Sequence, residues 1–376
     1  MFGTVLTTVV TSLHLYVFWR VGSIAPLTRH IHNRTILIAG VVMWSLFMVG
    51  RFYGHDNPGL LAGGLEHLSM NWMATLFLCA VGLLAVDLIT AWGWLWARHV
   101  WWLRSLGLAT GLVLAMVAMV QGMRPPLVSS YEVFLEGLPP QLDGMVIVAV
   151  SDLHLGSRLD EQWLAARIDQ IEAERPDLIF LLGDIYEGHS EPAPGLTTTL
   201  TRLQAPLGVW AVLGNHEFHR GGKPQAAAFS GNGFTVLRNS WTEAAEGLVL
   251  AGVDDLTYGQ RNGHGSAALH QALSGRPAGT TVLLSHSPLY ADEAAGAGVG
   301  LMLSGHTHGG QIWPFSYLVR LRYPFLAGRS QDGDMTVIVC RGTGTWGPRM
   351  RLWSPGEILR VTLHARAAAG DVAQGN

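Results

Sequence analysis

The chain has 376 residues, of which 49% are hydrophobic and 14% charged, and its formal net charge at pH 7 is −3. Residues 1–124 carry seven arginines against three acidic residues, whereas residues 125–376 carry 17 Lys and Arg against 24 acidic residues, a net of about −7. Nonspecific nucleic-acid binding needs a basic surface, so the acidic second part argues against a nucleic-acid partner.

The first 124 residues predict a transmembrane domain of about four helices. They contain three long runs without a charged side chain and a fourth run whose only charged residue is Asp87; the runs are residues 1–19, 35–50, 105–123 and 68–97. About 20 apolar residues span a bilayer, so we place helices near residues 2–20, 35–53, 72–96 and 104–122. A buried soluble helical domain is the weaker alternative, because helices of soluble proteins show a polar face.

Tryptophan usage and the N-terminus support this interpretation. Eight of the 14 tryptophans lie in this part of the chain. Five of them cluster at one predicted helix boundary, as in an interfacial aromatic belt: Trp92, Trp94, Trp96, Trp101 and Trp102. The first apolar run has no basic segment before it and no small-residue cleavage site, so we expect a retained helix rather than a cleaved signal peptide.

Loop charges predict how these helices are oriented. The loops after the first and third predicted helices are basic, with Arg20, Arg29, Arg34, Arg98 and Arg104. The second loop, residues 54–71, contains Asp56 and Glu66 but no Lys or Arg. Cytoplasmic loops carry the excess of basic residues. We therefore expect a multi-pass protein of the inner or plasma membrane, with both termini and the second domain outside the cytoplasm.

One carboxylate lies inside a predicted membrane helix. Asp87 is costly in lipid and needs a partner or a function. His14, in the first predicted helix, is a possible partner. We favour a structural hydrogen bond at Asp87 over a role in ion transport.

The second domain is predicted as an α/β domain, residues 125–366. Pro125-Pro126 ends the last helix, and the remaining chain is long enough for one well-buried core. Strands are expected near residues 145–150, 178–182, 208–213, 234–238, 248–253, 280–285, 299–303, 335–340 and 357–363, and helices near 161–174, 196–204, 223–230 and 265–274. The small polar tail, residues 367–376, is expected to be disordered.

Five short clusters of carboxylate, amide and imidazole side chains each follow one of these apolar runs. They are Asp152-Leu153-His154, Gly183-Asp184, Gly214-Asn215-His216-Glu217, Ser285-His286 and Gly305-His306-Thr307-His308. Open α/β sheets place their ligands on loops just past strand ends. One such pair is common by chance, but five in this order indicate a functional site.

The residue types indicate a site for two divalent metal ions. A mixed set of carboxylate oxygens and imidazole nitrogens suits Mn, Fe or Zn, of which we favour Mn. Two ions about 3.5–4 Å apart can clamp a phosphoryl group and convert a bridging water to hydroxide near neutral pH. No cluster contains cysteine, which disfavours a structural zinc site.

The pattern resembles the calcineurin-like metallophosphoesterase family over roughly residues 127–365. The segments Gly305–Trp313 and Arg341–Gly347 are similar to the membrane-linked bacterial branch, whose members often carry transmembrane helices ahead of the catalytic domain. The resemblance implies two packed β-sheets flanked by helices. It also implies that Asp152, His154 and His308 hold one metal, that Asn215, His286 and His306 hold the other, and that Asp184 bridges them.

The resemblance also implies two residues that act beside the metals. His216 matches the family histidine that contacts the phosphate and helps to protonate the leaving oxygen, and Asn215 also contacts substrate. Glu187 occupies the position of a carboxylate that orients this histidine, where aspartate is commoner. Purple acid phosphatases have a tyrosine there, so the sequence argues against a tyrosinate-ligated ferric site.

We expect a membrane-anchored hydrolase that cleaves a phosphodiester, pyrophosphate or phosphomonoester bond in a phosphorylated small molecule or lipid, including lipid-linked or cell-envelope substrates. The alternative is a membrane binding or transport protein with an inactive phosphoesterase-like domain, which complete ligands disfavour. The sequence indicates no oligomeric state.

Several polar residues match no motif. Surface or loop positions are favoured for His189, His219, His264, His270 and His364, and a turn or supporting role is favoured for Asp254 and Asp255. The aromatic-rich insertion after the last ligands contains Arg320, Arg322 and Arg329. These arginines either bind substrate phosphate or lipid headgroups or lie in an ordinary solvated lid loop.

Overall fold

The computed structural model describes residues 2–54, 59–156, 159–187, 194–218 and 233–366. The chain divides into two compact units, residues 1–123 with 347–353 and residues 124–346 with 354–376. We describe each unit on its own. The predicted helix at 223–230, the predicted tail and the two histidines His189 and His219 lie outside the described residues.

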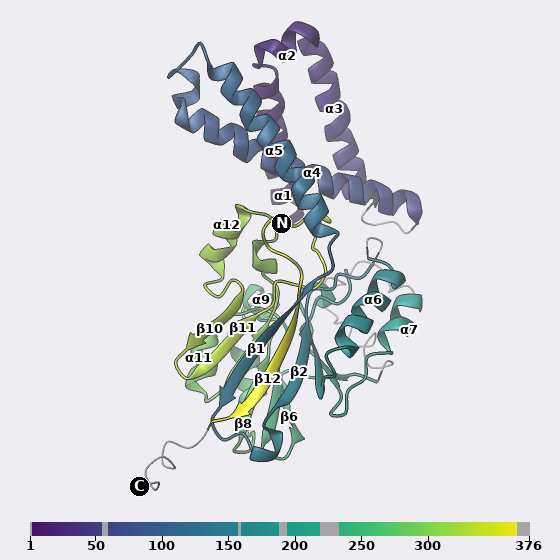
Figure 1. Ribbon diagram of the computed structural model, residues 1–376, viewed down its shortest axis with the longest axis vertical. Helices are drawn as coiled ribbons and strands as arrows, with labels where there is room; N and C mark the ends of the chain where they lie inside the picture. Colours follow the sequence, from purple (N-terminus) through teal and green to yellow (C-terminus); the bar gives the residue numbers. More distant parts are fainter. Residues whose placement is uncertain (1, 55–58, 157–158, 188–193, 219–232, 367–376) are drawn as a thin grey trace. The chain divides into compact units, whose positions relative to one another are not determined.

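The first unit is helical. Its elements are α1 (Phe2–Val21), α2 (Ala25–His30), α3 (Asn33–Val49), a π-helical turn (Gly50–Gly54), α4 (Leu60–Ile89), a 3-10 turn (Ala91–Gly93) and α5 (Val100–Gly122), drawn in purple and blue in Figure 1. Among the described residues, four helical segments are long and apolar enough to cross a membrane. The prediction of four membrane-length helices is therefore confirmed.

The bounds of α4 differ from the sequence prediction. The helix was placed at 72–96 but runs from Leu60 to Ile89, so Glu66 lies inside it and is only 4% exposed. Its start is stabilised by packing that the sequence does not reveal: a Cβ at Gly54 would lie 2.7 Å from the Glu66 amide. The helix ends before Trp92, whose φ of 58° is not helical.

Asp87 is buried among partners other than the one we expected. The prediction that His14 pairs with it is wrong, because His14 Nε2 lies 3.0 Å from the Gly40 carbonyl. Tyr16 donates to Asp87 Oδ2 at 2.7 Å, and Arg20 Nε lies 2.6 Å from the same oxygen. Arg104 donates to Oδ1 at 3.1 and 3.2 Å. The carboxylate thus joins α1, α4 and α5, which is a structural role.

A segment from late in the chain, residues 347–353, also belongs to the helical unit. Its backbone amides donate to α4 and α5: Arg349 to Asn71 Oδ1 at 3.0 Å, Arg351 to the Ala118 carbonyl at 2.9 Å and Trp353 to Gln121 Oε1 at 2.9 Å. The backbone of this segment is thereby satisfied by helix side chains and carbonyls. No pattern in the sequence indicates this pairing, since it joins residues more than 200 positions apart.

The second unit contains two six-stranded sheets. The first has the order β1 (Leu127–Leu135), β12 (Glu357–Ala365), β2 (Met145–Val150), β3 (Leu178–Leu181), β4 (Val209–Ala211) and β5 (Thr235–Val236). The second has the order β10 (Gly328–Asp332), β11 (Met335–Val339), β9 (Leu301–Ser304), β8 (Thr280–Leu284), β7 (Leu248–Gly252) and β6 (Ser240–Ala245). Strands β2 to β5 are parallel, as are β11, β9, β8 and β7.

Successive side chains along a strand of the first sheet pack into two different hydrophobic cores, one on each face of the sheet. On β2, Ile147 and Ala149 belong to the core that contains residues of both sheets, whereas Val148 and Val150 pack with α6 (Glu161–Glu172). Successive residues of a strand point to opposite faces, so both faces of the first sheet are buried. The predicted fold, two packed sheets flanked by helices, is confirmed.

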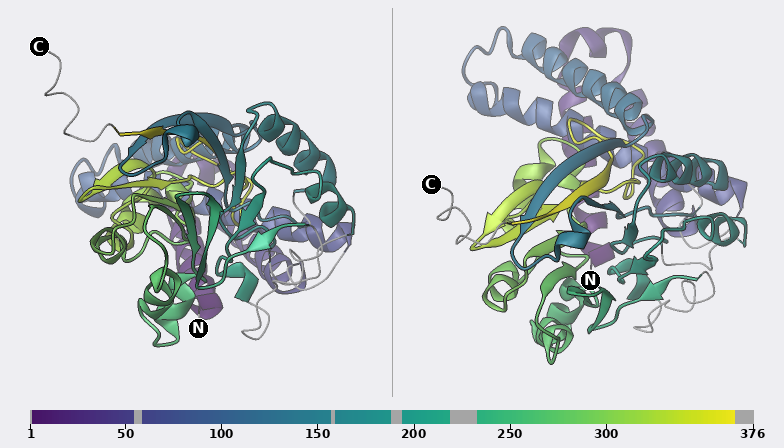
Figure 2. Two further views of the ribbon diagram at one scale, coloured as in Figure 1. Left: turned by 90° about the horizontal axis from the view of Figure 1, so that it is seen from below. Right: turned by 60° about the horizontal axis from the view of Figure 1, so that its bottom comes forward.

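The helices of this unit cover the outer faces of the sheets. Figure 1 shows α6 and α7 (Pro194–Leu200) together in teal, and Figure 2 turns the same arrangement. The second sheet packs with α9 (Leu256–Arg261), α10 (Ala267–Leu273) and α11 (Ala291–Gly296). A further helix, α12 (Phe315–Arg322), occupies the aromatic-rich insertion that we had treated as a loop.

Three strands were not predicted, namely β1, β6 and β10. Strand β1 pairs in parallel with β12, from Leu127 opposite Glu357 to Leu135 opposite Ala365. Figures 1 and 2 show these two strands side by side in blue and yellow, although they come from distant parts of the chain. The pairing is nonlocal, and β1 contains two serines and a glutamate, so its local sequence carries a weak strand signal.

Candidate metal centre

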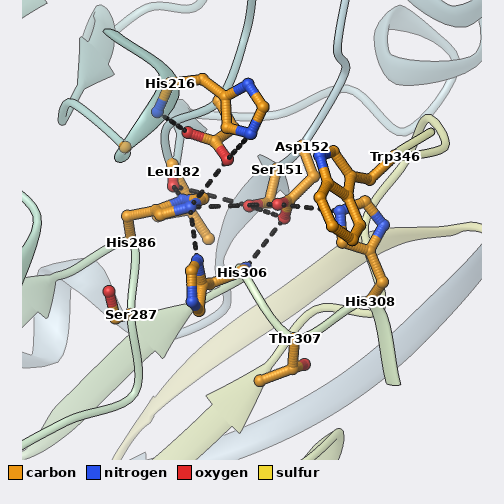
Figure 3. A network of polar contacts seen from close by, with 12 residues as sticks. Ser151, Asp152, Leu182, His216, His286, Ser287, His306, Thr307, His308 and Trp346 are labelled. Atoms are coloured by element: carbon orange, nitrogen blue, oxygen red, sulfur yellow. Dashed lines mark hydrogen bonds and ion pairs between the residues drawn. The ribbon is translucent and has the colours of Figure 1, made fainter. Parts of the chain in front are cut away.

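The five predicted clusters lie on loops at the carboxyl ends of neighbouring strands. Asp152 and His154 follow β2, Asp184 follows β3, and Asn215 with His216 follow β4. In the second sheet, His286 follows β8, and His306 with His308 follow the adjacent β9. Figure 3 shows Asp152, His216, His286, His306 and His308 converging on one region. Because both sheets direct these loops to the same place, residues 150 positions apart come within contact distance.

The first group of donor atoms consists of Asp152, His154 and His308. His308 Nε2 lies 3.2 Å from Asp152 Oδ1, and His154 Nε2 lies 3.9 Å from the same oxygen. The two imidazole Nε2 atoms are 3.3 Å apart. An oxygen and two nitrogens gathered at this spacing, all buried, form a suitable set of ligands for a divalent cation.

The second group consists of Asp184, His286 and His306. His286 Nε2 lies 3.2 Å from Asp184 Oδ2 and 3.2 Å from His306 Nδ1. Asp184 also forms a third group with His154 and His216, whose Nε2 atoms both lie 3.9 Å from Oδ2. One oxygen, Asp184 Oδ2, therefore faces histidines on both sides of the centre.

Each aspartate uses one oxygen for the scaffold and turns the other toward the centre. Asp152 Oδ2 accepts from the Ser151 hydroxyl at 2.5 Å and from the His306 amide at 3.0 Å. Asp184 Oδ1 accepts from the His216 amide at 2.9 Å. The remaining oxygens, Asp152 Oδ1 and Asp184 Oδ2, point at the imidazoles and are available as ligands.

Polar contacts on the far side of each ring fix which imidazole nitrogen faces the centre. His286 Nδ1 lies 2.8 Å from the Leu182 carbonyl, and His154 Nδ1 lies 3.0 Å from Glu187 Oε2. His286 donates through Nδ1, and His154 turns Nδ1 toward the Glu187 carboxylate, so Nε2 of both rings faces the centre. His306 is reversed, because its Nε2 lies 2.8 Å from the Tyr323 hydroxyl. Such outer contacts are typical of histidines that bind metals.

Asn215 carries a further candidate oxygen. Its Oδ1 is buried and has no hydrogen-bond partner among the residues that the structure describes. A buried carbonyl oxygen without a partner is destabilising by roughly 1–3 kcal/mol. A cation would satisfy it, so this atom fits the metal site that the surrounding aspartates and histidines suggest.

The backbone at this centre is strained. Five of the candidate ligands have positive φ angles, in the left-handed region that is uncommon for residues with a side chain: Asp152 at 54°, His154 at 47°, Asp184 at 51°, His306 at 70° and His308 at 50°. Each such residue costs on the order of 1–3 kcal/mol. The strained positions coincide with candidate metal ligands, which no residue pattern in the sequence shows.

Two glycines allow the ligand loops to approach each other closely. A Cβ at Gly214 would lie 2.2 Å from Asp184 Oδ1, and one at Gly305 would lie 1.8 Å from Ser151 Oγ. Any side chain at these positions would push the loops that carry Asp184 and Asp152 away from the centre.

Burial and neighbouring charges shift the pKa of each buried carboxyl group in opposite directions. Burial favours the neutral acid, but His308 and His286 outweigh it and hold the pKa of Asp152 below its usual range. His286 and His216 similarly hold the pKa of Asp184 well below its usual value. Burial lowers the pKa of His286, but the two carboxylates outweigh burial, so that this pKa lies well above its ordinary value. The aspartates therefore stay ionised and attract positive charge to the centre.

His216 lies at the edge of this cluster. Its Nε2 is 3.9 Å from Asp184 Oδ2, and its Nδ1 is 3.3 Å from the backbone carbonyl of Glu187. The Glu187 carboxylate is nearer to His154, at 3.0 Å, than to His216, at 4.0 Å. Burial lowers the pKa of His216, but the charges of Asp184 and Glu187 outweigh it and raise the pKa above its ordinary value. This balance favours a protonated ring.

Glu217 has a role that sequence reasoning missed. Its Oε2 accepts from the amides of Asp184 and Gly214 at 2.9 and 2.8 Å, and its Oε1 accepts from the amides of Ile185 and Tyr186 at 2.9 and 3.3 Å. Burial and the Asp184 charge raise the pKa of Glu217 to about 7, whereas four amide donors favour the ionised form. The carboxylate therefore joins the loop of the bridging candidate Asp184 to the loop of Asn215.

We expect Glu217→Gln to weaken this connection. An amide side chain cannot accept on both ends, so at least one buried N–H loses its partner at a cost of about 1–3 kcal/mol. Metal affinity should fall by roughly 10–100-fold, as for other outer contacts of metal sites. Thermal unfolding and metal titration would measure both effects. Glu243→Gln is a matched control, because Glu243 is exposed and accepts one amide, from Gly247. Unchanged unfolding and metal affinity in Glu217→Gln would contradict this role.

The remaining predicted residues are not members of the three donor groups. Arg320 and Arg322 are exposed on α12, where Arg322 donates to Gln260. Arg329 donates to the Glu132 carbonyl at 2.8 Å. Asp255 caps α9 by accepting from the Tyr258 amide at 2.7 Å, and Asp254 pairs with Arg238 at 2.7 Å. Of the histidines without a motif in the second unit, His264 and His270 are exposed and His364 is partly exposed.

The chain is similar to known metallophosphoesterases. A family model described as calcineurin-like phosphoesterase matches residues 145–310. The chain is 33% identical over 277 residues to the bovine "Transmembrane protein with metallophosphoesterase domain", which covers 69% of this chain and 62% of the relative. It thus spans less than two thirds of that relative's length.

Two bacterial relatives are covered more fully. The chain is 35% identical over 244 residues to an uncharacterised metallophosphoesterase of Aquifex aeolicus, covering 64% of this chain and 92% of the relative. It is 33% identical over 243 residues to another of Bacillus subtilis, covering 60% and 81%. Together with the two-sheet fold and the clustered Asp and His side chains, these matches confirm the resemblance seen in the motifs: the chain belongs to the calcineurin-like metallophosphoesterases.

Proposed function

We propose that the chain is a membrane-anchored phosphoesterase that uses two divalent metal ions, with Mn favoured. The main supporting observation is the convergence of six of the proposed ligands on one centre, with Asp184 Oδ2 facing both sides; they are Asp152, His154, Asp184, His286, His306 and His308. Family membership supports the same reaction class. The inactive alternative would tolerate the loss of a donor, whereas all seven are present.

The donors divide into two sets that share one oxygen. We assign Asp152 Oδ1, His154 Nε2 and His308 Nε2 to the first ion, and Asn215 Oδ1, His286 Nε2 and His306 Nδ1 to the second. Asp184 Oδ2 belongs to both sets. When bound, two such ions polarise the phosphoryl oxygens and lower the pKa of a water molecule that attacks phosphorus.

Two further residues act on the proton and on the ligands. We assign His216 to contact the substrate phosphate, with Asn215, and to give a proton to the leaving oxygen. The Glu187 carbonyl orients the His216 ring, and the Glu187 carboxylate holds His154 with Nε2 toward the centre. Glu187 is thus proposed as a positioning residue for two histidines.

A substrate screen of the purified, Mn-loaded full chain tests this function. Bis(p-nitrophenyl) phosphate, p-nitrophenyl phosphate and a lipid pyrophosphate represent the diester, monoester and pyrophosphate bonds. We propose that the natural substrate contains one of these bonds and is lipid-linked or part of the cell envelope. Failure to hydrolyse any of the three with the metals bound would contradict the proposed function.

We also propose that the catalytic domain, residues 125–366, lies outside the cytoplasm. Arg20 and Arg104 are buried on Asp87, so the exposed arginines of the first and third loops, Arg29, Arg34 and Arg98, carry the orientation signal. The segment between Gly54 and Leu60 contains no Lys or Arg. The positive-inside rule then places the first and third loops in the cytoplasm.

Reporter fusions after Asn376 test this topology. Four membrane-spanning helices put both termini on the same side, so a reporter that works only in the periplasm should be active and one that works only in the cytoplasm should be silent. The opposite pair of results would invert the topology and place the substrate in the cytoplasm. Because the metal ligands do not depend on orientation, the proposed chemistry would be unaffected.

A further inference from the structure

Helix α12, Phe315–Arg322, presents an apolar face to solvent. Tyr317 is 65% exposed, Leu318 57% and Leu321 85%. These residues are spaced by one and three to four positions, so they share one side of the helix. A helix on the surface of a soluble domain normally turns polar side chains outward. The exposed apolar face of α12 is therefore expected to be covered by a binding partner.

The opposite side of α12 is fixed to the domain. Val319 packs against the outer core of the second sheet, which includes Tyr323 and Met335. The ligand loop also packs on the helix, because a Cβ at Gly310 would lie 2.3 Å from Ser316 Cα. Contacts with the rest of the domain thus fix the orientation of α12. Its exposed apolar side chains do not pack in the core.

Arginines flank the exposed apolar face. Arg320 and Arg322 lie on either side of it, both are exposed, and α12 contains no acidic residue. This combination of an apolar strip with basic edges is typical of helices that lie in a membrane interface, where leucine and aromatic side chains enter the acyl boundary and arginines contact lipid phosphates.

Helix α12 is also directly connected to the candidate metal centre. It follows His308 in the same stretch of chain and ends at Tyr323, whose hydroxyl lies 2.8 Å from Nε2 of the ligand candidate His306. A surface held by α12 would therefore be close to the donor atoms. The exposed face and the centre are thus joined by direct contacts within the domain.

We propose that α12 docks on the surface of the lipid bilayer and that the centre acts on a phosphate carried by a lipid in that surface. The four membrane-length helices of the chain and the two flanking arginines identify an anionic lipid surface as the occupant rather than a second protein. This inference rests on the proposed phosphoesterase function for its substrate, but the docking itself does not.

A polarity-sensitive fluorophore at position 317 tests the docking. The native cysteines, Cys79 and Cys340, are both buried, so Tyr317→Cys in the full chain provides an accessible thiol. Phe134→Cys is the matched control, because Phe134 is a 53% exposed aromatic residue on β1. In vesicles of phosphatidylcholine and phosphatidylglycerol, we expect the label at 317, but not the label at 134, to be blue-shifted and quenched by spin-labelled lipid. Equal exposure of both labels to water would overturn the docking.

Activity on paired substrates tests the substrate class. Phosphatidic acid and CDP-diacylglycerol are compared with glycerol 3-phosphate and CDP-choline, which carry the same bonds without acyl chains. In Leu318→Gln/Leu321→Gln, we expect kcat/KM on the hydrolysed lipid to fall on the order of tenfold or more, because apolar burial is lost. Turnover of p-nitrophenyl phosphate or bis(p-nitrophenyl) phosphate should be unchanged, as in Phe134→Gln.

The outcomes separate the two proposals. If the wild-type chain hydrolyses the nitrophenyl esters but shows no preference for either lipid over its water-soluble partner, the lipid assignment is wrong and the phosphoesterase function stands. If it hydrolyses no phosphate ester at all, the proposed function fails, and the fluorophore at position 317 still decides whether α12 docks on lipid.

Discussion

Asp184→Asn is expected to remove both metal ions from the centre. Asp184 Oδ1 accepts the His216 amide at 2.9 Å, and an asparagine that keeps this bond turns its NH2 group toward the histidines. The single oxygen shared by the two ligand sets is then replaced by a group that cannot bind a cation. The negative charge between two cations is lost as well, and with it their mutual screening.

The expected loss of metal affinity in Asp184→Asn exceeds the roughly 10–100-fold that follows loss of an outer contact. Elemental analysis after desalting measures it as ions per chain. Asp254→Asn is the matched control, since Asp254 also follows a strand of the second unit but pairs with Arg238 at 2.7 Å. Two ions retained at normal affinity in Asp184→Asn would show that Asp184 does not bridge.

His216→Ala is expected to keep both metals and to lose turnover. His216 lies beside Asp184 Oδ2, with its pKa raised by Asp184 and Glu187 against the effect of burial. A positioned acid of this kind contributes about 10²–10⁴-fold to the rate. The loss should be smaller for esters of nitrophenol, because this leaving group needs little protonation.

A comparison of leaving groups measures this dependence on His216. The turnover of p-nitrophenyl and simple alkyl phosphates is compared in wild type, His216→Ala and His364→Ala. His364 is a matched control, because it is partly exposed and pairs with Glu132 and Asp143, away from the donor groups. Full activity of His216→Ala on alkyl esters would remove His216 from the mechanism.

The sequence predicted the position of the centre because local patterns and sheet geometry agree there. Apolar runs identified β2, β3, β4, β8 and β9, and the carboxyl ends of parallel strands place loops at one edge of a sheet. Asp152 and Asp184 could therefore be placed together from the strand pattern, whereas the place of His286, which follows a strand of the other sheet, came from the family resemblance. The assignment of each side chain to one ion or the other came from the family resemblance.

The outer contacts could not be predicted, because they depend on pairings between distant loops. Glu217 is adjacent to His216 in a recognised motif, yet its function is set by amides of residues 184–186. Tyr323 supports His306 from within an insertion without a motif. The left-handed backbone of Asp152 and His154 is imposed by packing against the intrinsic preference of these residues.

In the helical unit, too, local patterns could be predicted from the sequence, whereas packing between distant segments could not. Hydropathy found four helices, since membrane-length apolar runs are a strong signal. It misplaced the start of α4 at residue 72 because Gly63, Gly64 and Glu66 have low hydropathy, whereas packing of Glu66 keeps Leu60–Ile89 helical. Likewise, the partners of Asp87 come from two other helices, α1 and α5. Their identity depends on how these helices pack rather than on any one segment.

The metal dependence of hydrolysis tests the central claim most directly. The full chain is purified, its metal content is measured, and hydrolysis of bis(p-nitrophenyl) phosphate and p-nitrophenyl phosphate is followed before chelation, after chelation and after Mn is restored. We predict two divalent ions per chain, hydrolysis that disappears on chelation, and recovery with Mn. Hydrolysis that persists at full rate in the metal-free protein, or a protein that binds two ions and hydrolyses no phosphate ester, would contradict the account.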